Sequence, residues 1–461
     1  MGKQVITPPV TKTRIAAASA TRGGDYIPLG PGGTSAPRKR NVVCTFGDAN
    51  VGYLSSGSGF STFTIADLPL AGPNGQTKGA KVAIAGSANA VATLRSYTFA
   101  AAAAGSVPSS LGLKSFAKAV GQVLYALVYV DGDPYQLNTA YTDSIQVRFE
   151  KDGSNYVDWF FSTSSFRLKA GWNMLLMRWD GATSSVEAVP SVTGSVADGS
   201  TITRVLVGAQ SGTGTLTYYV AEAGYYDAAP GRPLIALTFD GYYAEHVSRA
   251  LPLLQAKGVK ATFTTGAGYS WNEPTLTAAL MAGGMEVGHQ IYQHIDYPQN
   301  GDSTYGAELD KAIGYARALG HNWRVQSMPY NDITKAQVAI AGGKGVRIVR
   351  EARQIITPIV EWGAGAGMIS GAYGIGQFGA DNITLAALKA AADGAVRYGG
   401  LVAMTCHQLV TGGTSGNTTG SSTQTYVEHL GDFIEYAKTQ GCTFVTLSQV
   451  VRSLDALSAV N

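Results

Sequence analysis

Hydrophobic residues recur at two different periods along the chain. Between residues 42 and 229 they fall in short runs that alternate with polar residues, as Ile145, Val147 and Phe149 do. A two-residue period is typical of a strand with one buried face. Similar runs lie at 126–130, 156–161, 172–179, 201–208 and 215–222. We therefore predict a β-sandwich for 42–229.

After residue 230 strand-like runs alternate with longer stretches of helical period. The predicted strands are 234–239, 261–266, 286–290, 325–330, 346–351, 401–407 and 442–448. The predicted helices are 246–258, 275–284, 305–320, 333–343, 384–399 and 423–440. This alternation predicts a parallel sheet with helices outside it, either a barrel or a doubly wound sheet.

The first 41 residues follow neither pattern. They hold five prolines and several glycines without sustained periodicity, and we interpret 1–41 as an extended anchoring arm. The predicted organisation is therefore an arm at 1–41, a β-sandwich at 42–229 and an α/β domain at 230–461. The opening MGKQVITPPV lacks the apolar core of a signal peptide, so we expect no export by that route.

The distribution of charged and apolar residues argues against two classes of function, nucleic-acid binding and membrane insertion. Only 14% of the 461 residues are charged, and 34 basic against 31 acidic residues give a net charge of +3. Basic residues cluster only at Arg38, Lys39 and Arg40, which we interpret as a solvated linker, so nucleic-acid binding is not expected. No stretch approaches the ~20 apolar residues of a membrane span, so no membrane insertion is expected.

Candidate chemistry is confined to the α/β part. All six histidines lie there, and His246, His289, His294 and His407 each lie at the end of a predicted parallel strand. The carboxyl ends of such strands are where α/β folds build their sites.

The α/β part resembles the polysaccharide deacetylases, the NodB-homology domain of carbohydrate esterase family four. The resemblance covers 230–455 and rests on segments in the family's order: LIALTFDGYYAEHVSRALPLLQAKGVKATF, EVGHQIYQHIDY, SMPYND, GVRIVREAR, LVAMTCHQ and GCTFVTLSQVV. It implies a deformed (β/α) barrel. It also implies hydrolysis of an acetyl amide or ester assisted by a divalent metal, commonly zinc, held by one Asp and two His.

The resemblance assigns roles residue by residue. Asp240 matches the catalytic base, and His407 matches the acid that protonates the leaving group. Tyr330 matches the residue whose backbone N–H holds the oxyanion, Arg353 the arginine that orients the base, and His294 the second metal-binding histidine.

Three positions depart from the family pattern. Gly241 stands where the family has a metal-binding Asp, Gln290 where it has the first metal-binding His, and Ser327 where it has an Arg. His289 or His246 could join His294 and Asp240 in a rebuilt metal site. Two alternatives stay open: one bound zinc, or no metal and a retired enzyme fold that still binds sugar or is purely structural. The remaining candidates, for contacting substrate, are Tyr242, Gln290, Asp296 and Asn331.

The β-sandwich resembles lectin-like jelly rolls in its W-N-x-L-x-x-x-W run at 172–179 and its late G-Y-Y-D run. Its aromatic residues suit either a sugar-stacking face or the core: Trp159, Trp172, Trp179, Tyr218, Tyr219, Tyr225 and Tyr226.

The whole architecture resembles a bacteriophage tail fibre or tailspike. We therefore expect a homo-oligomer in the virion tail, released by host lysis. Its arm at 1–41 would attach to other tail proteins, and its partner would be a bacterial surface polysaccharide, either deacetylated by the chain or only bound.

Overall fold

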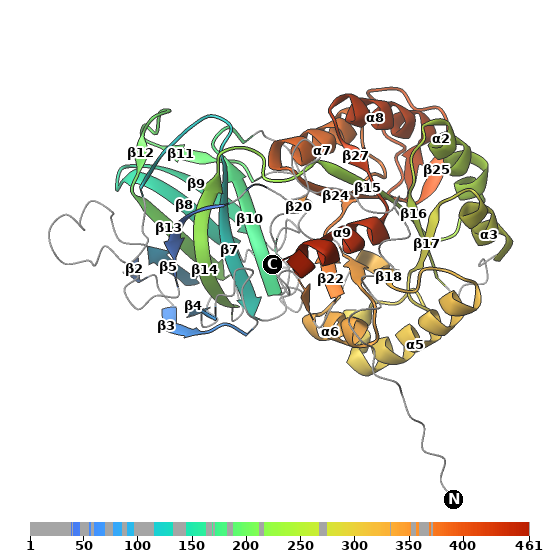
Figure 1. Cartoon of the computed structure of the whole chain (residues 1–461), viewed down its shortest axis with the longest axis horizontal. Coiled ribbons are helices and arrows are strands. Elements are labelled where there is room, and N and C mark those ends of the chain that lie inside the picture. The colour runs from blue at the N-terminus through green and yellow to red at the C-terminus, as the bar shows by residue number, and fades with distance from the viewer. Residues whose placement is uncertain are drawn as a thin grey trace, which may run out of the picture.

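The computed structural model forms two bodies that lie side by side, one of antiparallel sheets and one of alternating strands and helices (Figure 1). The described residues are 38, 40–46, 55–56, 60–69, 77–84, 90–95, 115–131, 144–162, 168, 171–181, 188–211, 216–266, 274–331, 333–351, 356–358, 368–369 and 372–460. The predicted arm at 1–41 lies almost wholly outside them. None of the helices in these residues is both long and apolar enough to cross a membrane.

The first body, called here the two-sheet body, consists of two six-stranded antiparallel sheets. One runs in the order β10 (Gly171–Arg178), β7 (Val123–Asp131), β14 (Leu216–Tyr226), β4 (Lys78–Ile84) and β3 (Phe60–Asp67), with β1 (Asn41–Thr45) also paired to β14. The other runs in the order β11 (Ser191–Thr193), β9 (Asn155–Ser162), β8 (Ser144–Asp152), β13 (Arg204–Ser211), β5 (Ala90–Arg95) and β2 (Ser55–Ser56). A two-stranded sheet of β6 (Phe116–Ala117) and β12 (Thr201–Ile202) lies apart from both.

The two sheets share one hydrophobic core. Ile145, Val147 and Phe149 of β8 are fully buried in it, as their spacing predicts, opposite alternate residues of β7 and β14. Five of the aromatic candidates are buried rather than exposed as a sugar-binding face. Trp159 and Tyr218 lie in this core, and Trp172, Tyr219 and Tyr226 lie in a second apolar cluster on the other face of the first sheet. Lectin-like kinship stays a prediction.

The second body, called here the barrel, is a ring of parallel strands. Its hydrogen-bonded order is β24 (Gly400–Cys406), β15 (Leu234–Asp240), β16 (Thr262–Thr265), β17 (Glu286–His289), β18 (Val325–Ser327), β19 (Ile348–Arg350) and β22 (Ala372–Ile375). Two residues after β22 the chain enters β23 (Phe378–Gly379), which pairs in parallel with β24 and completes the ring. The predicted deformed (β/α) barrel is thereby confirmed.

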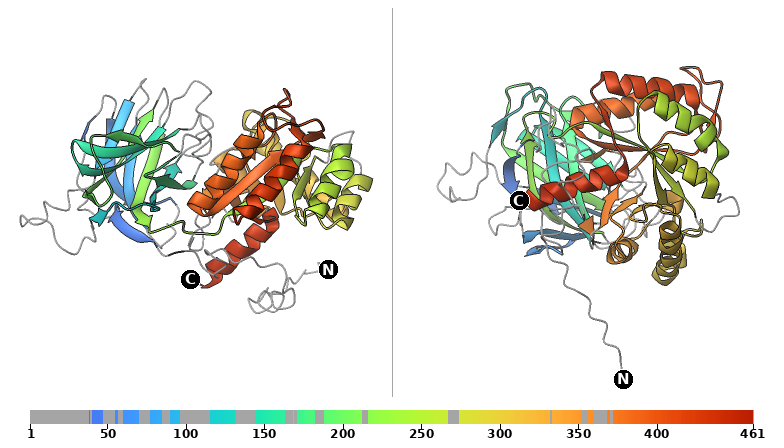
Figure 2. Two further views of the ribbon diagram at one scale, coloured as in Figure 1. Left: turned by 90° about the horizontal axis from the view of Figure 1, so that it is seen from above. Right: turned by 45° about the vertical axis from the view of Figure 1, so that its right-hand side comes forward.

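Smaller strands extend the barrel sheet or lie beside it. They are β20 (Ile356–Pro358), β21 (Met368–Ile369), β27 (Thr443–Phe444) and the separate pair β25 (Gln408–Val410) and β26 (Gln424–Tyr426). Helices cover the outside of the ring, as the turned views show (Figure 2). They are η4 (His246–Ala250, a π-helix), α2 (Leu251–Ala256), α3 (Pro274–Ala282), α4 (Tyr297–Asn300), α5 (Asp302–Ala318), η5 (Pro329–Asn331, a 3-10 turn), α6 (Lys335–Gly343), α7 (Leu385–Tyr398), α8 (Val427–Thr439) and α9 (Leu447–Val460).

Local sequence signals explain where α6 and α7 begin and end. Thr334 and Gln337 form a reciprocal capping box at the start of α6, and the Thr384 hydroxyl accepts the Ala387 N–H at the start of α7. Gly399 ends α7 in the left-handed region at φ 60°, where a Cβ would lie 2.4 Å from the Gly231 carbonyl oxygen. Only glycine fits this junction between the helix and the segment that enters β15.

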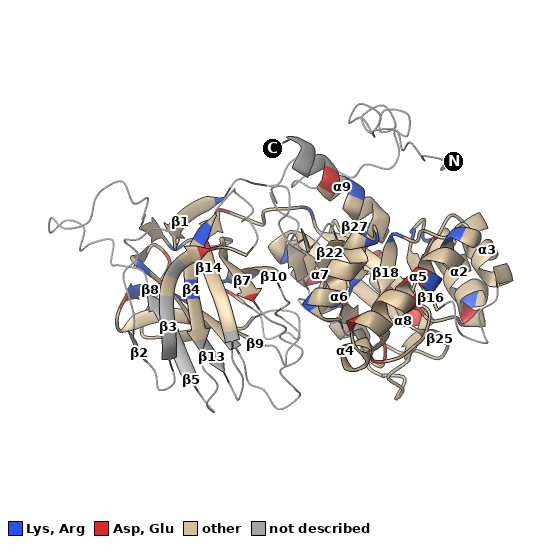
Figure 3. Cartoon of the chain, turned by 90° about the horizontal axis from the view of Figure 1, so that it is seen from below, with Lys and Arg blue, Asp and Glu red and all other residues tan. Residues whose placement is uncertain are grey.

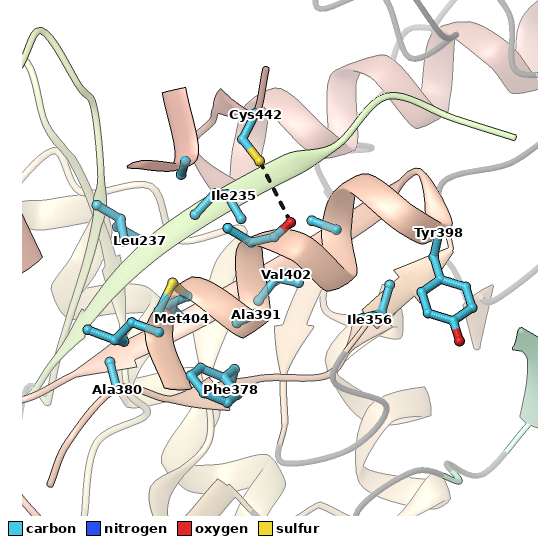
Figure 4. Close-up of a cluster of buried hydrophobic side chains, with 14 of the residues drawn as sticks. Ile235, Leu237, Ile356, Phe378, Ala380, Ala391, Tyr398, Val402, Met404 and Cys442 are labelled. Atoms are coloured by element: carbon cyan, nitrogen blue, oxygen red, sulfur yellow. Dashed lines mark hydrogen bonds between the residues drawn. The ribbon is translucent and has the colours of Figure 1, made fainter. Parts of the chain in front are cut away.

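The barrel core lies between the strands and α7 and α8. Ile235, Leu237, Val402 and Met404 point from β15 and β24 towards α7 (Figure 4). The same cluster continues through Tyr398 to the outer face of β7, β10 and β14, so the two bodies share apolar contacts.

Polar contacts add to the apolar contacts between the two bodies. Arg397 of α7 donates to the Asp180 carbonyl at 2.6 Å, and Arg178 donates to the Arg397 carbonyl at 3.2 Å. Lys335 pairs with Asp131 at 3.0 Å. These contacts and the shared apolar cluster hold the two-sheet body against the barrel.

Three predicted elements differ from the structure. The strand expected over 325–330 is only Val325–Ser327, because Pro329–Asn331 form the η5 turn. The helix expected over 423–440 begins at Val427, because Gln424–Tyr426 form β26 beside β25. The strand expected over 442–448 is only Thr443–Phe444, because α9 already begins at Leu447.

Candidate active site

A buried polar network crosses the barrel at the carboxyl ends of its strands. Asp240, the last residue of β15, accepts a hydrogen bond from the Thr264 hydroxyl at 2.7 Å through Oδ1 and pairs with the Arg350 guanidinium through Oδ2. The Ser327 hydroxyl donates to Thr264 at 2.7 Å, and Arg350 also contacts Thr405. Asp240 and Arg350 are 2% and 0% exposed at their side chains. The candidate base is therefore neutralised by a buried countercharge on the opposite side of the ring.

The arginine that pairs with Asp240 lies three residues before the one expected. Arg353 falls outside the described residues, so its role stays a prediction. Among the described residues, Arg350 on β19 makes the contact with Asp240. Arg350 is the register partner of Ser327 on β18, where the deacetylase pattern has its arginine. The guanidinium therefore reaches Asp240 across the ring from β19, the strand next to β18.

His407 follows β24 and is held by a carboxylate that the sequence analysis did not single out. Its Nδ1 lies 2.6 Å from Asp381 Oδ2, and its backbone N–H donates to Asp381 Oδ1 at 3.2 Å. The Thr425 hydroxyl also donates to that carboxylate, at 2.7 Å. Burial disfavours the charged ring, but Asp381 and Asp240 outweigh it, so the pKa of His407 is raised. With Nδ1 held by Asp381, the other ring nitrogen, Nε2, is the one that can donate to a ligand.

His246 and His289 are core histidines in this structure. His289 Nε2 lies 3.0 Å from the Trp323 carbonyl, and its Nδ1 accepts the Ile291 N–H at 3.3 Å, so both ring nitrogens are used. His246 Nε2 lies 2.9 Å from the His407 carbonyl. Burial lowers the pKa of each to about 4. The structure thus does not bring either ring to a metal site with His294.

His294 lies at the mouth of the barrel against Tyr330. The two rings meet edge to face with centroids 4.6 Å apart, and Tyr330 is 61% exposed. Tyr330 and Ile291 both have φ 54°, a left-handed conformation that costs energy for non-glycine residues. Burial lowers the pKa of His294, while Asp240 raises it and His407 lowers it, so the three groups lie within electrostatic reach of one another.

The donors at this end of the barrel do not fit a resident zinc. Gly241, at φ 75°, offers no side chain, and Gln290 offers a neutral amide, which is a weak zinc ligand. Both oxygens of Asp240 are already bonded to Thr264 and Arg350. Among the described residues no three His, Cys, Asp or Glu side chains are grouped as a metal site. The hydrogen bonds of His289 and His246 inside the core do not favour the metal-binding roles predicted for them.

The four residues predicted to contact substrate differ in burial and in hydrogen bonding. Gln290 is 4% exposed and donates its backbone N–H to the Thr265 carbonyl. Tyr242 is 7% exposed, directly after Gly241. Asp296 caps α4 through hydrogen bonds to the Gln299 backbone and side chain, which is a structural role. Asn331 ends the η5 turn, and its side chain is outside the described part.

Comparisons with known proteins find similarity in the barrel. Residues 227–349 match the family model "Polysaccharide deacetylase". The uncharacterised protein YlxY of Bacillus subtilis is 26% identical over 121 residues, or 26% of this chain, and this chain spans 38% of that relative.

Solved structures that match part of the chain include the family 4 carbohydrate esterase from Streptomyces lividans in complex with acetate. It is 15% identical, covers 47% of this chain and 94% of its own, and has a TM-score of 0.34. A family 4 pseudoenzyme from Bacillus anthracis is 16% identical, covers 48% and 66%, and has a TM-score of 0.32. On the family-model match, the barrel contains a polysaccharide deacetylase domain of the NodB-homology type.

Proposed function

We propose that the barrel recognises an acetylated bacterial surface polysaccharide without metal-dependent turnover. The observation that carries the proposal is the donor set: Gly241 and Gln290 replace two metal ligands, and the nearest alternative, His289, uses both ring nitrogens inside the core. The polar groups that do not depend on a metal are retained. His407 keeps its Asp381 partner, and Asp240 keeps a buried countercharge.

The mouth of the barrel offers groups that suit a sugar. The exposed Tyr330 ring beside His294 provides a surface for the C–H face of a pyranose. His407 Nε2 can donate to an acetyl oxygen or a hydroxyl. Both features operate without a metal and explain how a deacetylase fold could keep its ligand after losing its reaction.

We extend this proposal to a bacteriophage tail. Its support is the order of parts: residues 1–41 before the folded bodies, a two-sheet body and then a deacetylase barrel. In this proposal 1–41 attaches to other tail proteins, and the chain works as a homo-oligomer that presents the barrel to the cell surface.

The proposal is tested with N-acetylglucosamine and O-acetylxylose oligomers and their deacetylated counterparts. We expect the chain to bind at least one acetylated oligomer better than its counterpart by calorimetry, with no change after chelator treatment. Tyr330→Ala should weaken this binding about fivefold to tenfold, because the stacking surface is lost. Phe160→Ala removes an exposed ring, 51% exposed on β9 of the two-sheet body, and should leave binding unchanged.

Two results would overturn the proposal. One is release of acetate that a chelator abolishes, since the site would then turn over through a metal. The other is binding that ignores acetylation or is equal in wild type and Tyr330→Ala.

A further inference from the structure

The two-sheet body contains a cavity of about 740 Å³ where the chain enters and leaves its first sheet. Its described walls come from the start of β1, from β6 and from the end of β14 and the residues after it. The side chains used in the argument are those of Arg38, Arg40, Asn41, Phe116, Tyr225 and Asp227. The volume lies in the range of ~300–1,000 Å³ typical of small-ligand sites.

The basic segment that the sequence predicts as a solvated linker forms part of this cavity. Arg38 is fixed twice: its backbone N–H donates to the Pro230 carbonyl at 2.7 Å, and its Nε donates to the Ala229 carbonyl at 3.3 Å. These two hydrogen bonds do not use the two Nη groups of Arg38, which lines the cavity. Arg40 is 7% exposed and pairs with the buried Glu222 at 3.4 Å.

Acceptors lie on the same wall as these donors. Asn41 donates its side-chain N–H to Asp227 Oδ2 at 3.2 Å, and this hydrogen bond does not use Asn41 Oδ1 or Asp227 Oδ1. Basic and acidic segments lie close together beside β1 and β14 (Figure 3). Arg40 pairs with Glu222, and Arg38 and Asp227 carry opposite charges on the lining, so the described lining has no excess charge.

An aromatic pair lines the cavity, with the buried Phe116 packed against the partly exposed Tyr225. The Phe116 and Tyr225 rings are stacked with centroids 4.4 Å apart and an interplanar angle of 19°. Burial, and then the nearby Asp227, raise the pKa of Tyr225, so its hydroxyl stays protonated. Stacked rings beside paired donors and acceptors, at balanced charge, suit a ligand with one C–H face and several hydroxyl groups.

From this geometry we propose that the cavity is a second carbohydrate site, which binds a neutral sugar unit independently of the barrel. The Arg38 Nη groups donate to sugar hydroxyls, Asp227 and Asn41 accept from them, and the Tyr225 ring, backed by Phe116, contacts the face of the sugar ring. A chain with two sugar sites, one on each body, would hold a polysaccharide at two points, which raises avidity without new contacts at either site.

The test uses the full chain and tetramers of galactose, glucose, mannose and rhamnose. We expect at least one tetramer to bind by calorimetry and to slow amide hydrogen exchange in the peptides that cover 40–46 and 221–229. Arg38→Gln and Asp227→Asn should each weaken that binding about tenfold or more, because each removes a charge-assisted hydrogen bond. Binding should not change with ionic strength, since the ligand is neutral.

Matched controls and localisation keep this proposal separate from the one for the barrel. Arg324→Gln on the barrel and Asp198→Asn in the two-sheet body remove the same charges from exposed positions and should have no effect. Exchange protection confined to barrel peptides, or equal affinity in wild type and Arg38→Gln, would overturn the cavity proposal and leave the barrel proposal standing. No binding of any neutral tetramer, or binding that weakens steeply with salt, would also overturn it.

Discussion

Arg350→Met is expected to lower the free energy of unfolding by about 3–5 kcal/mol, because it leaves Asp240 as an unpaired charge inside the barrel. Arg350 is fully buried and reaches Asp240 from β19, while Asp240 lies at the end of β15. The double variant Asp240→Asn/Arg350→Met removes both charges and should recover much of the loss, since replacing a whole buried pair is far less costly than breaking it.

Urea unfolding of the three proteins measures these differences, and the barrel supplies a matched control. Arg347, three residues earlier, pairs with Asp455 at 2.6 Å, but the two side chains are 33% and 45% exposed. Arg347→Met should therefore cost at most ~1 kcal/mol, the usual value for a surface pair. Equal losses of unfolding free energy in Arg350→Met and Arg347→Met would show that the Asp240–Arg350 pair does not stabilise the barrel as a buried ion pair.

The second expected result is a gain of metal binding in the double variant Gly241→Asp/Gln290→His. It restores the two donors that the deacetylase pattern places beside His294, so that one Asp and two His are present at the mouth of the barrel. We expect it to hold about one zinc per chain after metal repletion, as a three-ligand site does. Aspartate is among the residues that tolerate the φ of 75° at Gly241, although its Cβ would lie 3.1 Å from the Tyr243 ring, which must shift slightly.

Controls decide whether the restored donors act together. Gly241→Asp alone and Gln290→His alone should bind zinc far more weakly, and adding His294→Ala to the double variant should abolish binding. Metal content by mass spectrometry, with circular dichroism to confirm folding, measures all four. A folded double variant without zinc would mean that the backbone at Ile291, and not the missing side chains, prevents the metal site.

The periods of the hydrophobic pattern predicted most of the fold. Alternating residues such as Val147 and Phe149 identified strands of the two-sheet body, because one face of each strand lies in a shared core. The barrel strands and helices followed from their alternation along the chain. The extra strands β25 and β26 were not predicted, because three-residue segments carry no measurable period.

The candidate site was only partly predictable, because its contacts join residues far apart in the chain. Asp240 and His407 could be found from strand ends and the family motif. Their partners Arg350 and Asp381 could not, since Asp381 follows a two-residue strand and Arg350 acts across the ring from Asp240. The burial of His289 could not be predicted either, because its partner, the Trp323 carbonyl, lies on a loop 34 residues away.

The proposal that the barrel binds its ligand without a metal is tested most directly by zinc content. It is measured in the wild-type chain after stripping with chelator and repletion with zinc, beside His294→Ala. We predict no zinc above background in either protein, together with binding of an acetylated oligomer and no acetate release. About one zinc per chain in the wild type, lost in His294→Ala, would contradict it, because the barrel would then hold a metal through ligands that the structure assigns to its core.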